Sequence, residues 1–505
     1  MPLLALPVEL LDKIFIESIR VRSFQRAMRL RLVSRGFMYY TNRAIFYSRI
    51  LDTEYNKWLH PLNCFCNTAE VSFMQKYLAY RIPLEDDPRL LGVRVRRVAE
   101  RICELTGNTG DGGLNSCIQS LCGLYFWGDT YKTGDLIESK LGSEPTEEHL
   151  KLDLVTAAVY LNLPTLASQL HSEKEDDYSI SLIELDNMRW ARYGIASFYG
   201  NLDMIKILLA TDPTKEAKVG RLVPMDYVVE MIKWSALGGH SEIFNFALDN
   251  SEEFKLSHRR DVDYRDLRDA MNWTAFPKDY QRVAAIFGSE SEVFSAKQDG
   301  DLDSRLCESA DNGRVEMVRY FLDQGACLNN PLAKRGCIHE SESGITRRTT
   351  TPLLSALRRC PLGSEAVVKL MLERGADPNW YPPEKTPLMA AVHNNRFEIT
   401  RMLVDYGADV NDGSPAPIVL AARNENTEIF QYLRERGATI DTPETGSWAM
   451  AYAKFYGLDS MVALLVHEGV DETAALQRAS SRKETWTDWT CVYKHQPELH
   501  LKYSF

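Results

Sequence analysis

The hydrophobic pattern of the chain is clearest over residues 386–411, where it predicts two short helices joined by a tight turn. Thr386 and Pro387 suit a helix start, because the hydroxyl can cap free amides and a proline at the first helical position loses no hydrogen bond. The pair Asn394–Asn395 suits the turn, and Gly407 can end the second helix in a left-handed conformation. One face of that second helix carries the apolar residues Phe397, Ile399, Met402 and Leu403.

The same pattern recurs along the chain at varied spacing. Copies that keep the small residues, the turn residue, the apolar second helix and the final glycine begin near residues 304, 351, 386, 416 and 448. Weaker copies begin near residues 152, 191, 230 and 265. One helical hairpin of this size cannot bury its own apolar faces, so the repetition predicts a stack of similar units.

The motifs of these copies resemble the ankyrin repeat. The resemblance rests on Thr-Pro-Leu and alanine in the first helix, on glycine, valine and paired leucines around the second, and on the Gly-Ala-Asp-Val-Asn ending at Asn411. The histidine that the family places after Thr-Pro-Leu is replaced by Leu354, Met389, Val419 and Met450. The resemblance implies an all-α solenoid of about eight or nine repeats with projecting hairpin loops, in which the degenerate N-terminal repeats are the softer end.

We therefore expect four segments along the chain. Residues 1–50 form a small helical module, and residues 51–150 form a helical linker or N-terminal cap of the array. Residues 151–472 form the ankyrin solenoid, which is best formed over residues 304–472. Residues 473–505 form either a C-terminal cap or a disordered tail, and the sequence leaves both possibilities open.

The first fifty residues contain two amphipathic runs. In the first run, apolar side chains fall at helical spacing at Leu6, Leu10, Leu11, Ile14 and Phe15. Pro7 is well placed to open this helix. A segment with so few large apolar groups makes a poor independent core, so it should pack on a partner or on the next helix. Its composition alone fits a helical cap of the array.

The order of residues in this segment resembles an F-box, the helical module that docks substrate receptors on the small adaptor subunit of cullin-RING ubiquitin ligases. The resemblance rests on the Leu-Pro start of residues 6–14 and on LRLVSRGF at residues 30–37. A basic stretch stands at residues 16–24, where the family usually has a short Asp-Pro turn. By resemblance, the residues that enter the adaptor are Leu6, Pro7, Leu10, Ile14, Leu32 and Val33. An F-box followed by ankyrin repeats resembles the arrangement of fungal F-box/ankyrin proteins.

Two features stand out on the loop side of the predicted array. Residues 329–350 lengthen one repeat and have the polar, charged composition of an extended exposed loop. Trp380 and Tyr381 follow a Gly-Ala-Asp-Pro-Asn ending, where the ankyrin family places a projecting loop. Aromatic side chains at such a tip are of the kind that anchors protein interfaces, so we predict that they bind the target. The alternative is that the pair packs on the next loop.

The first fifty residues differ in charge from the rest of the chain. The whole chain of 505 residues has a formal net charge of −11, whereas residues 1–50 carry nine basic and three acidic side chains. The acidic balance argues against nucleic acid as a partner, and no apolar run approaches the ~18 residues of a membrane helix. Glu9 and Asp12 interrupt the apolar start, so we expect no signal peptide and an intracellular protein of the cytoplasm or nucleus.

The sequence contains no motif that carries chemistry. The spacing of cysteines and histidines fits a zinc site poorly, and we find no phosphate-binding loop, dinucleotide fingerprint or nucleophile elbow. We therefore expect no catalytic residue, no metal and no cofactor. Two hypotheses follow: a substrate receptor of an SCF-type ubiquitin ligase whose repeats select a protein target, or a ligase-independent ankyrin scaffold whose N-terminal helices merely cap the solenoid.

Overall fold

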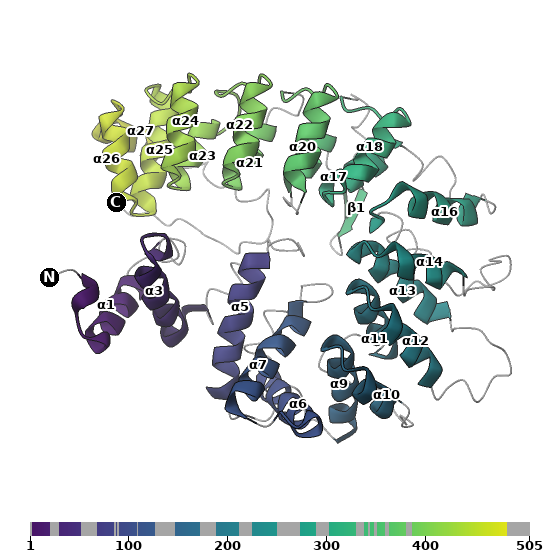
Figure 1. Ribbon diagram of the computed structural model, residues 1–505. Helices are drawn as coiled ribbons and strands as arrows, with labels where there is room; N and C mark the ends of the chain where they lie inside the picture. Colours follow the sequence, from purple (N-terminus) through teal and green to yellow (C-terminus); the bar gives the residue numbers. More distant parts are fainter. Residues whose placement is uncertain are drawn as a thin grey trace. The chain divides into compact units, whose positions relative to one another are not determined.

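The computed structural model describes residues 3–20, 30–51, 68–84, 87, 90–108, 110–126, 147–171, 188–211, 225–249, 273–288, 302–329, 338–341, 344–347, 351–358, 363–379 and 386–481. These residues belong to two compact units, Met1–Ala270 and Met271–Phe505. Helices dominate both units (Figure 1), as the sequence predicts. No helix among the described residues is both long and apolar enough to cross a membrane.

The first unit begins with a small helical head. Its elements are η1 (Leu3–Ala5), α1 (Val8–Arg20), η2 (Leu30–Leu32) and α3 (Arg35–Ser48). Ser34 caps α3, because its hydroxyl accepts a hydrogen bond from the backbone N–H of Phe37 at 3.2 Å. The backbone of Arg49 ends α3 in the left-handed region, at φ 52°.

The head packs on the helix that follows it, α5 (Thr68–Arg81). One hydrophobic cluster joins the two, and its buried members are Leu11, Phe15, Ile19, Ala44, Ile45, Leu51, Phe73, Met74 and Tyr77. The ring of Phe46 lies 5.5 Å from the rings of Phe73, Tyr77 and Tyr80. The head therefore gains its core by sharing it with α5, as expected for a segment too small to fold on its own apolar groups.

Three further helical elements follow α5 and η3 (Ile82–Leu84). They are α6 (Leu91–Thr106), α7 (Asp111–Leu121) and η4 (Cys122–Phe126). Arg94 of α6 forms a buried ion pair with Asp153 of the next helix, α9, and their side chains are 2% and 0% exposed. The pairing is bidentate: the second of its two hydrogen bonds joins Arg94 Nη2 to Asp153 Oδ1 at 3.0 Å. This contact fixes α6 to the first helical hairpin.

Three helical hairpins make up the rest of the described part of the first unit. They consist of α9 (Glu147–Tyr160) with α10 (Pro164–His171), α11 (Met188–Phe198) with α12 (Leu202–Thr211), and α13 (Met225–Gly238) with α14 (Ser241–Asp249). A residue with positive φ forms each turn: Asn162 at 55°, Gly200 at 74° and Gly239 at 76°. These hairpins lie at the copies predicted to begin near residues 152, 191 and 230. Their assignment to the ankyrin family stays a prediction.

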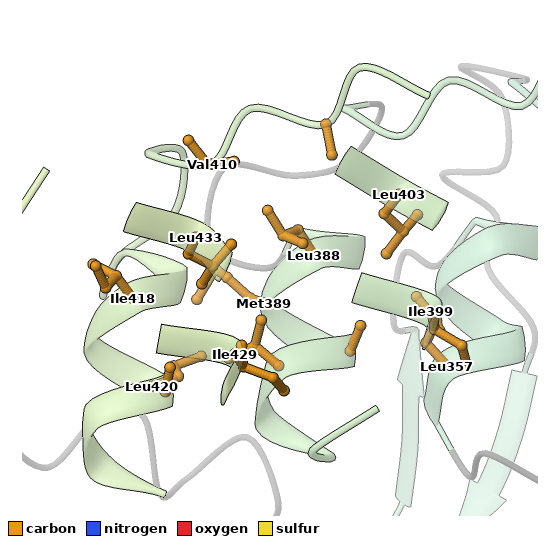
Figure 2. Packing of buried hydrophobic residues seen from close by; sticks show 14 of the residues in the cluster. Leu357, Leu388, Met389, Ile399, Leu403, Val410, Ile418, Leu420, Ile429 and Leu433 are labelled. Atoms are coloured by element: carbon orange, nitrogen blue, oxygen red, sulfur yellow. The ribbon is translucent and has the colours of Figure 1, made fainter. Parts of the chain in front are cut away.

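The second unit continues the series of hairpins. Its helices are α16 (Pro277–Gly288), α17 (Leu302–Asp311), α18 (Val315–Asp323), α19 (Pro352–Arg358), α20 (Ser364–Glu373), α21 (Pro387–His393), α22 (Phe397–Asp405), α23 (Pro417–Arg423), α24 (Thr427–Glu435), α25 (Pro443–Phe455), α26 (Asp459–His467) and α27 (Glu472–Ser481). One continuous hydrophobic cluster runs through this unit from Leu306 to Ala475. In Figure 2, Leu388 and Met389 lie between residues of their own hairpin (Ile399, Leu403) and residues of the next one (Ile429, Leu433).

The start and stop signals of the repeat at residues 386–411 are confirmed. Thr386 caps α21, because its hydroxyl accepts a hydrogen bond from the backbone N–H of Met389 at 2.8 Å. Asn395 forms the turn with φ 54°, and Gly407 takes φ 92° after the second helix. Glycines with φ between 91° and 94° also follow the second helices of the neighbouring hairpins, at Gly325, Gly375, Gly437 and Gly469.

Two expectations about the second unit need correction. The repeat predicted to begin at Trp448 begins at Thr442, which caps α25 through the backbone N–H of Thr445 at 3.2 Å, so α25 has 13 residues where α21 and α23 have seven. The all-α expectation meets one exception. Within the stretch expected as an exposed loop, β1 (Ile338–Ser341) and β2 (Gly344–Arg347) form an antiparallel hairpin in which Ile338 is opposite Arg347.

The end of the array is covered by α27. Lys454 of α25 forms an ion pair with Glu472 of α27 at 2.6 Å, and Ala475 is buried in the core cluster. Residues 472–481 therefore pack on the last hairpin, and the choice between a cap and a tail for residues 473–505 stays a prediction. The remaining residues, 482–505, lie outside the described part of the chain.

Candidate protein-interaction surfaces

The helix α1 carries apolar side chains on two faces. Leu11, Phe15 and Ile19 are spaced four residues apart and are buried in the head core. Leu10 and Ile14 point to solvent instead, and their exposed fractions are 47% and 38%. A helix with a second apolar face in contact with water is a typical site for a protein partner.

The other predicted adaptor-binding residues of the head differ in exposure. Pro7 is exposed and Val33 is 63% exposed, whereas Leu6 is partly buried against the head core. Leu32 lies in η2, and its side chain is outside the described part of the structure. Nine of the eighteen exposed large hydrophobic side chains among the described residues belong to the head: Leu3, Leu4, Val8, Leu10, Ile14, Val33, Met38, Tyr39 and Tyr47. The head thus concentrates apolar surface far beyond its share of the chain.

The outer side of α3 adds a second feature to the head. Arg43 donates a hydrogen bond to the hydroxyl of Tyr39 at 3.3 Å, and its guanidinium lies 5.2 Å from the ring centre of Tyr47. It also forms an ion pair with Asp12 of α1 at 3.0 Å. The hydrogen bond to Tyr39 and the nearby Asp12 carboxylate raise the pKa of Arg43. The ion pair between Arg43 and Asp12 connects α3 to α1 across the head.

In the array, the predicted loop-tip residues Trp380 and Tyr381 lie outside the described residues. What the structure does describe on the loop side is a ladder of asparagines. Asn379 donates to the backbone carbonyl of Gly407 at 2.8 Å and accepts from the backbone N–H of Asp409 at 2.9 Å. Each asparagine of this ladder, which we call a rung, therefore joins its own loop to the loop of the next repeat by two hydrogen bonds.

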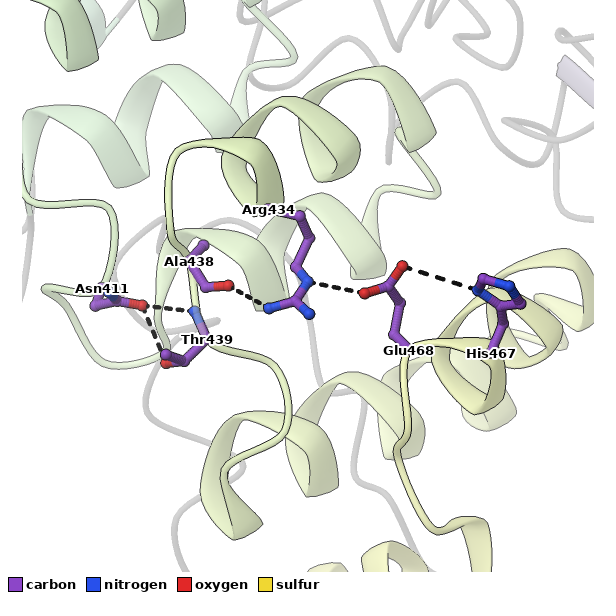
Figure 3. Close-up of polar contacts among 6 residues, drawn as sticks. All are labelled: Asn411, Arg434, Ala438, Thr439, His467 and Glu468. Carbon is purple, nitrogen blue, oxygen red and sulfur yellow. Dashed lines mark hydrogen bonds and ion pairs between the residues drawn. The ribbon is translucent and has the colours of Figure 1, made fainter.

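The same rung occurs before and after Asn379. Asn329 binds the Gly375 carbonyl and the Asp377 N–H. Asn411 binds the carbonyl of Gly437 at 3.2 Å and the N–H of Thr439 at 2.8 Å. Figure 3 shows Asn411 beside Thr439, with Arg434 between the carbonyl of Ala438 and the carboxylate of Glu468. The ladder and this arginine hold successive loops in a fixed register.

The first helices of three neighbouring hairpins carry a second candidate surface, which we call the aromatic column. It consists of His393 on α21, Arg423 on α23, Trp448, Tyr452 and Phe455 on α25, and Tyr456 at the C-cap of α25. The Arg423 guanidinium lies 5.6 Å from the ring centre of Tyr452. The rings of Tyr452 and Tyr456 are nearly parallel, with centres 6.4 Å apart, and Phe455 meets Tyr456 edge to face at 4.8 Å.

Burial changes the proton affinities within the column. Desolvation and the nearby Arg423 lower the pKa of His393 to about 4, so this imidazole is neutral at physiological pH. Desolvation also raises the pKa of Tyr452, and Arg423 opposes that effect. The column therefore presents one permanent positive charge, on Arg423, among aromatic rings.

Two of these features were not predicted. The asparagine ladder had a signal in the sequence, since asparagine recurs four residues after a loop glycine at Asn329, Asn379 and Asn411. The aromatic column had none at the level of the repeat pattern, because its members share a surface only once the register of α21, α23 and α25 is known. Among the described residues, no group of histidine, cysteine and acidic side chains is arranged to hold a metal ion.

Comparison with known proteins agrees with the hairpin and loop geometry of the second unit. The family model for ankyrin repeats (three copies) matches residues 306–414 and 388–476. The chain is 27% identical to the ankyrin repeat and KH domain-containing protein mask-1 of Caenorhabditis elegans, over 35% of this chain and 8% of that protein. It is 32% identical to the putative ankyrin repeat protein FPV014 of fowlpox virus, over 32% of this chain and 36% of that protein.

A third relative is BRCA1-associated RING domain protein 1 of Caenorhabditis elegans, which is 38% identical over 19% of this chain and 14% of that protein. The chain thus spans between 8% and 36% of the length of these three relatives. The match is to ankyrin repeats, and the second unit of the chain contains them. Because ankyrin repeats are protein–protein interaction modules, the chain contains such a module.

Proposed function

We propose that the chain is a substrate receptor of an SCF-type ubiquitin ligase, with the head docking on the small adaptor subunit and the ankyrin repeats selecting a protein target. The observation that supports it is the second apolar face of the head. Leu10, Ile14 and Val33 stand at positions that enter the adaptor in the F-box family, and all three are exposed rather than used in the head core. Full burial of such a side chain contributes about 1.5–3 kcal/mol, and burying the fraction that is still exposed here contributes roughly half of that for each.

Co-purification of the full chain with the purified adaptor tests this function. The unmodified chain should retain the adaptor, and the variant Leu10→Asp/Val33→Asp should lose at least tenfold in affinity, since each carboxylate would be desolvated in the interface. Val466→Asp is the control, because Val466 is 50% exposed in the second unit and its replacement places the same kind of carboxylate outside the head. Failure of the unmodified chain to retain the adaptor, or full retention by the double variant, would refute the docking.

A ligase-independent scaffold is the second candidate, and the shared core of the head and α5 favours it. Removing the head would uncover Phe73, Met74 and Tyr77, which are buried in that cluster. If capping is the role of the head, a fragment of residues 55–505 should show a sharply lower melting temperature and unchanged partner binding. A stable, fully folded fragment would speak against the capping role.

In either function the chain acts by binding. The absence of catalytic chemistry and of cofactors stays a prediction of the sequence, as does a location in the cytoplasm or nucleus. Incubating the purified chain with the remaining ligase subunits and a captured target would separate the two candidates, since only a substrate receptor increases ubiquitin transfer to that target.

A further inference from the structure

The aromatic column is the place where the last repeat departs from its neighbours. Aligned on the turn residues Asn395, Glu425 and Gly457, all of which have positive φ, α25 differs from α21 and α23 at every exposed position near the turn. Tyr452 stands where the earlier repeats have alanine and leucine, and Tyr456 stands where they have asparagine.

The asparagines at that position form hydrogen bonds between neighbouring repeats, which the side chain of a tyrosine cannot replace. Asn394 donates a hydrogen bond to the carbonyl of Leu357 in the preceding repeat at 2.9 Å, and Asn424 donates to the carbonyl of His393 at 3.0 Å. Tyr456, which holds the equivalent position in the third repeat, has no side-chain amide to donate such a hydrogen bond. Its side chain is 37% exposed, and the neighbouring Phe455 is 36% exposed. Two neighbouring aromatic side chains thus stand in water at a position where the repeat pattern uses a structural amide.

Arg423 gives the column its charge. Its guanidinium lies over the Tyr452 ring, and no acidic side chain forms an ion pair with it anywhere in the part of the chain that the structure describes. The neighbouring cations behave differently: Arg434 is paired with Glu468, and Lys454 with Glu472. A half-buried arginine held against a ring, without a carboxylate, is suited to receive one from outside.

We propose that the aromatic column binds an extended acidic segment of a protein target, with an aspartate or glutamate of that segment on Arg423 and its apolar neighbours on Phe455 and Tyr456. The inference rests on the proposed function, in which the repeats select a protein. Charge complementarity decides the class of partner, since the column has a single cation and no carboxylate of its own. Nucleic acid is disfavoured, because phosphate backbones are bound by several cations and the chain has a net charge of −11.

Selection from a random displayed library of 12-residue peptides on the full-length chain tests the proposal. Enriched peptides should carry an acidic residue flanked by apolar ones. Their affinity should fall at least tenfold in Arg423→Glu and several-fold in Tyr456→Ala. Arg401→Glu is the matched control, because Arg401 is an exposed arginine on α22, paired with Glu398 at 2.6 Å. Melting curves of each variant establish that the array is folded.

The outcomes separate cleanly. The proposal is overturned if no peptide is enriched, if the enriched peptides lack acidic residues, or if they bind Arg423→Glu as tightly as the unmodified chain. Competition by a single-stranded DNA 20-mer at equal concentration would also overturn it in favour of nucleic acid. Adaptor retention depends on the head and is measured on the same variants, so its failure refutes the ligase role and leaves the peptide result standing.

Discussion

Removing one partner of the buried ion pair between Arg94 and Asp153 is expected to destabilise the first unit by about 3–5 kcal/mol. Both side chains are almost wholly buried, and one of their two hydrogen bonds measures 3.0 Å. At that separation, and with an effective dielectric constant of 20, the attraction is roughly 5 kcal/mol. This gain offsets the several kcal/mol lost when each ion leaves water. The pair is therefore close to neutral as a unit, and a single remaining charge is costly.

Urea unfolding followed by circular dichroism measures the effect, with hydrogen exchange of the α6 and α9 amides to locate it. Arg94→Met and Asp153→Leu should each lower the free energy of unfolding of the first unit by about 3–5 kcal/mol. The double variant should lie within about 2 kcal/mol of the unmodified chain, because two apolar side chains can replace the pair. Urea is suitable because it does not screen charge.

The double variant decides the matter. If its loss equals the sum of the two single losses, the two side chains do not act as a pair, and the bidentate geometry is not what makes the single replacements costly. Exchange should accelerate first in α9 and α10, since the pair connects α6 to that hairpin. Acceleration confined to the second unit would contradict the assignment.

Two further predictions concern the second unit. The pKa of His393 is lowered to about 4 in the folded chain, so below pH 6.5 the unfolded chain binds a proton that the folded chain does not. The free energy of unfolding should therefore fall by up to about 3 kcal/mol between pH 6.5 and pH 4. In urea titrations at several pH values, His393→Gln should remove this part of the pH dependence. Asn379→Ala removes the two hydrogen bonds to Gly407 and Asp409 and should lower the free energy of unfolding by about 1–3 kcal/mol in the same assay. The control Asn312→Ala removes a hydrogen bond to the backbone of its own helix and should lower it by less. Equal losses would show that the asparagine ladder adds no stability between repeats.

Much of the array was predictable because its signals are local. Caps, turn residues and final glycines act within a few residues, so Thr386, Asn395 and Gly407 could be read from the sequence alone. The start of α25 was misplaced because alignment on the repeats favoured Trp448, although Thr442 and the proline after it repeat the Thr-Pro signal of residues 386–387.

The surfaces were less predictable because they depend on packing partners. Leu10, Leu11, Ile14 and Phe15 are all apolar and adjacent in the sequence, and their spacing does not tell which pair is buried. Contact with α3 and α5 decides it, by taking Leu11 and Phe15 into the core. The pairing of Arg94 with a residue 59 positions away is likewise invisible to any local pattern.

The asparagine ladder also bears on how the array can grow. The residue at the next rung after Asn411 is Asp441, whose carboxylate can accept hydrogen bonds but cannot donate one to a following carbonyl. The hairpin of α25 and α26 follows this loop without that donor. A copy inserted directly after Asp441 would therefore lack the donor as well, whereas a copy inserted between residues 379 and 411 would find both donor and acceptor in place. Duplication of a repeat upstream of Asn411 should therefore cost the least stability, and Asp441→Asn is the first substitution to introduce before a repeat is added after residue 441.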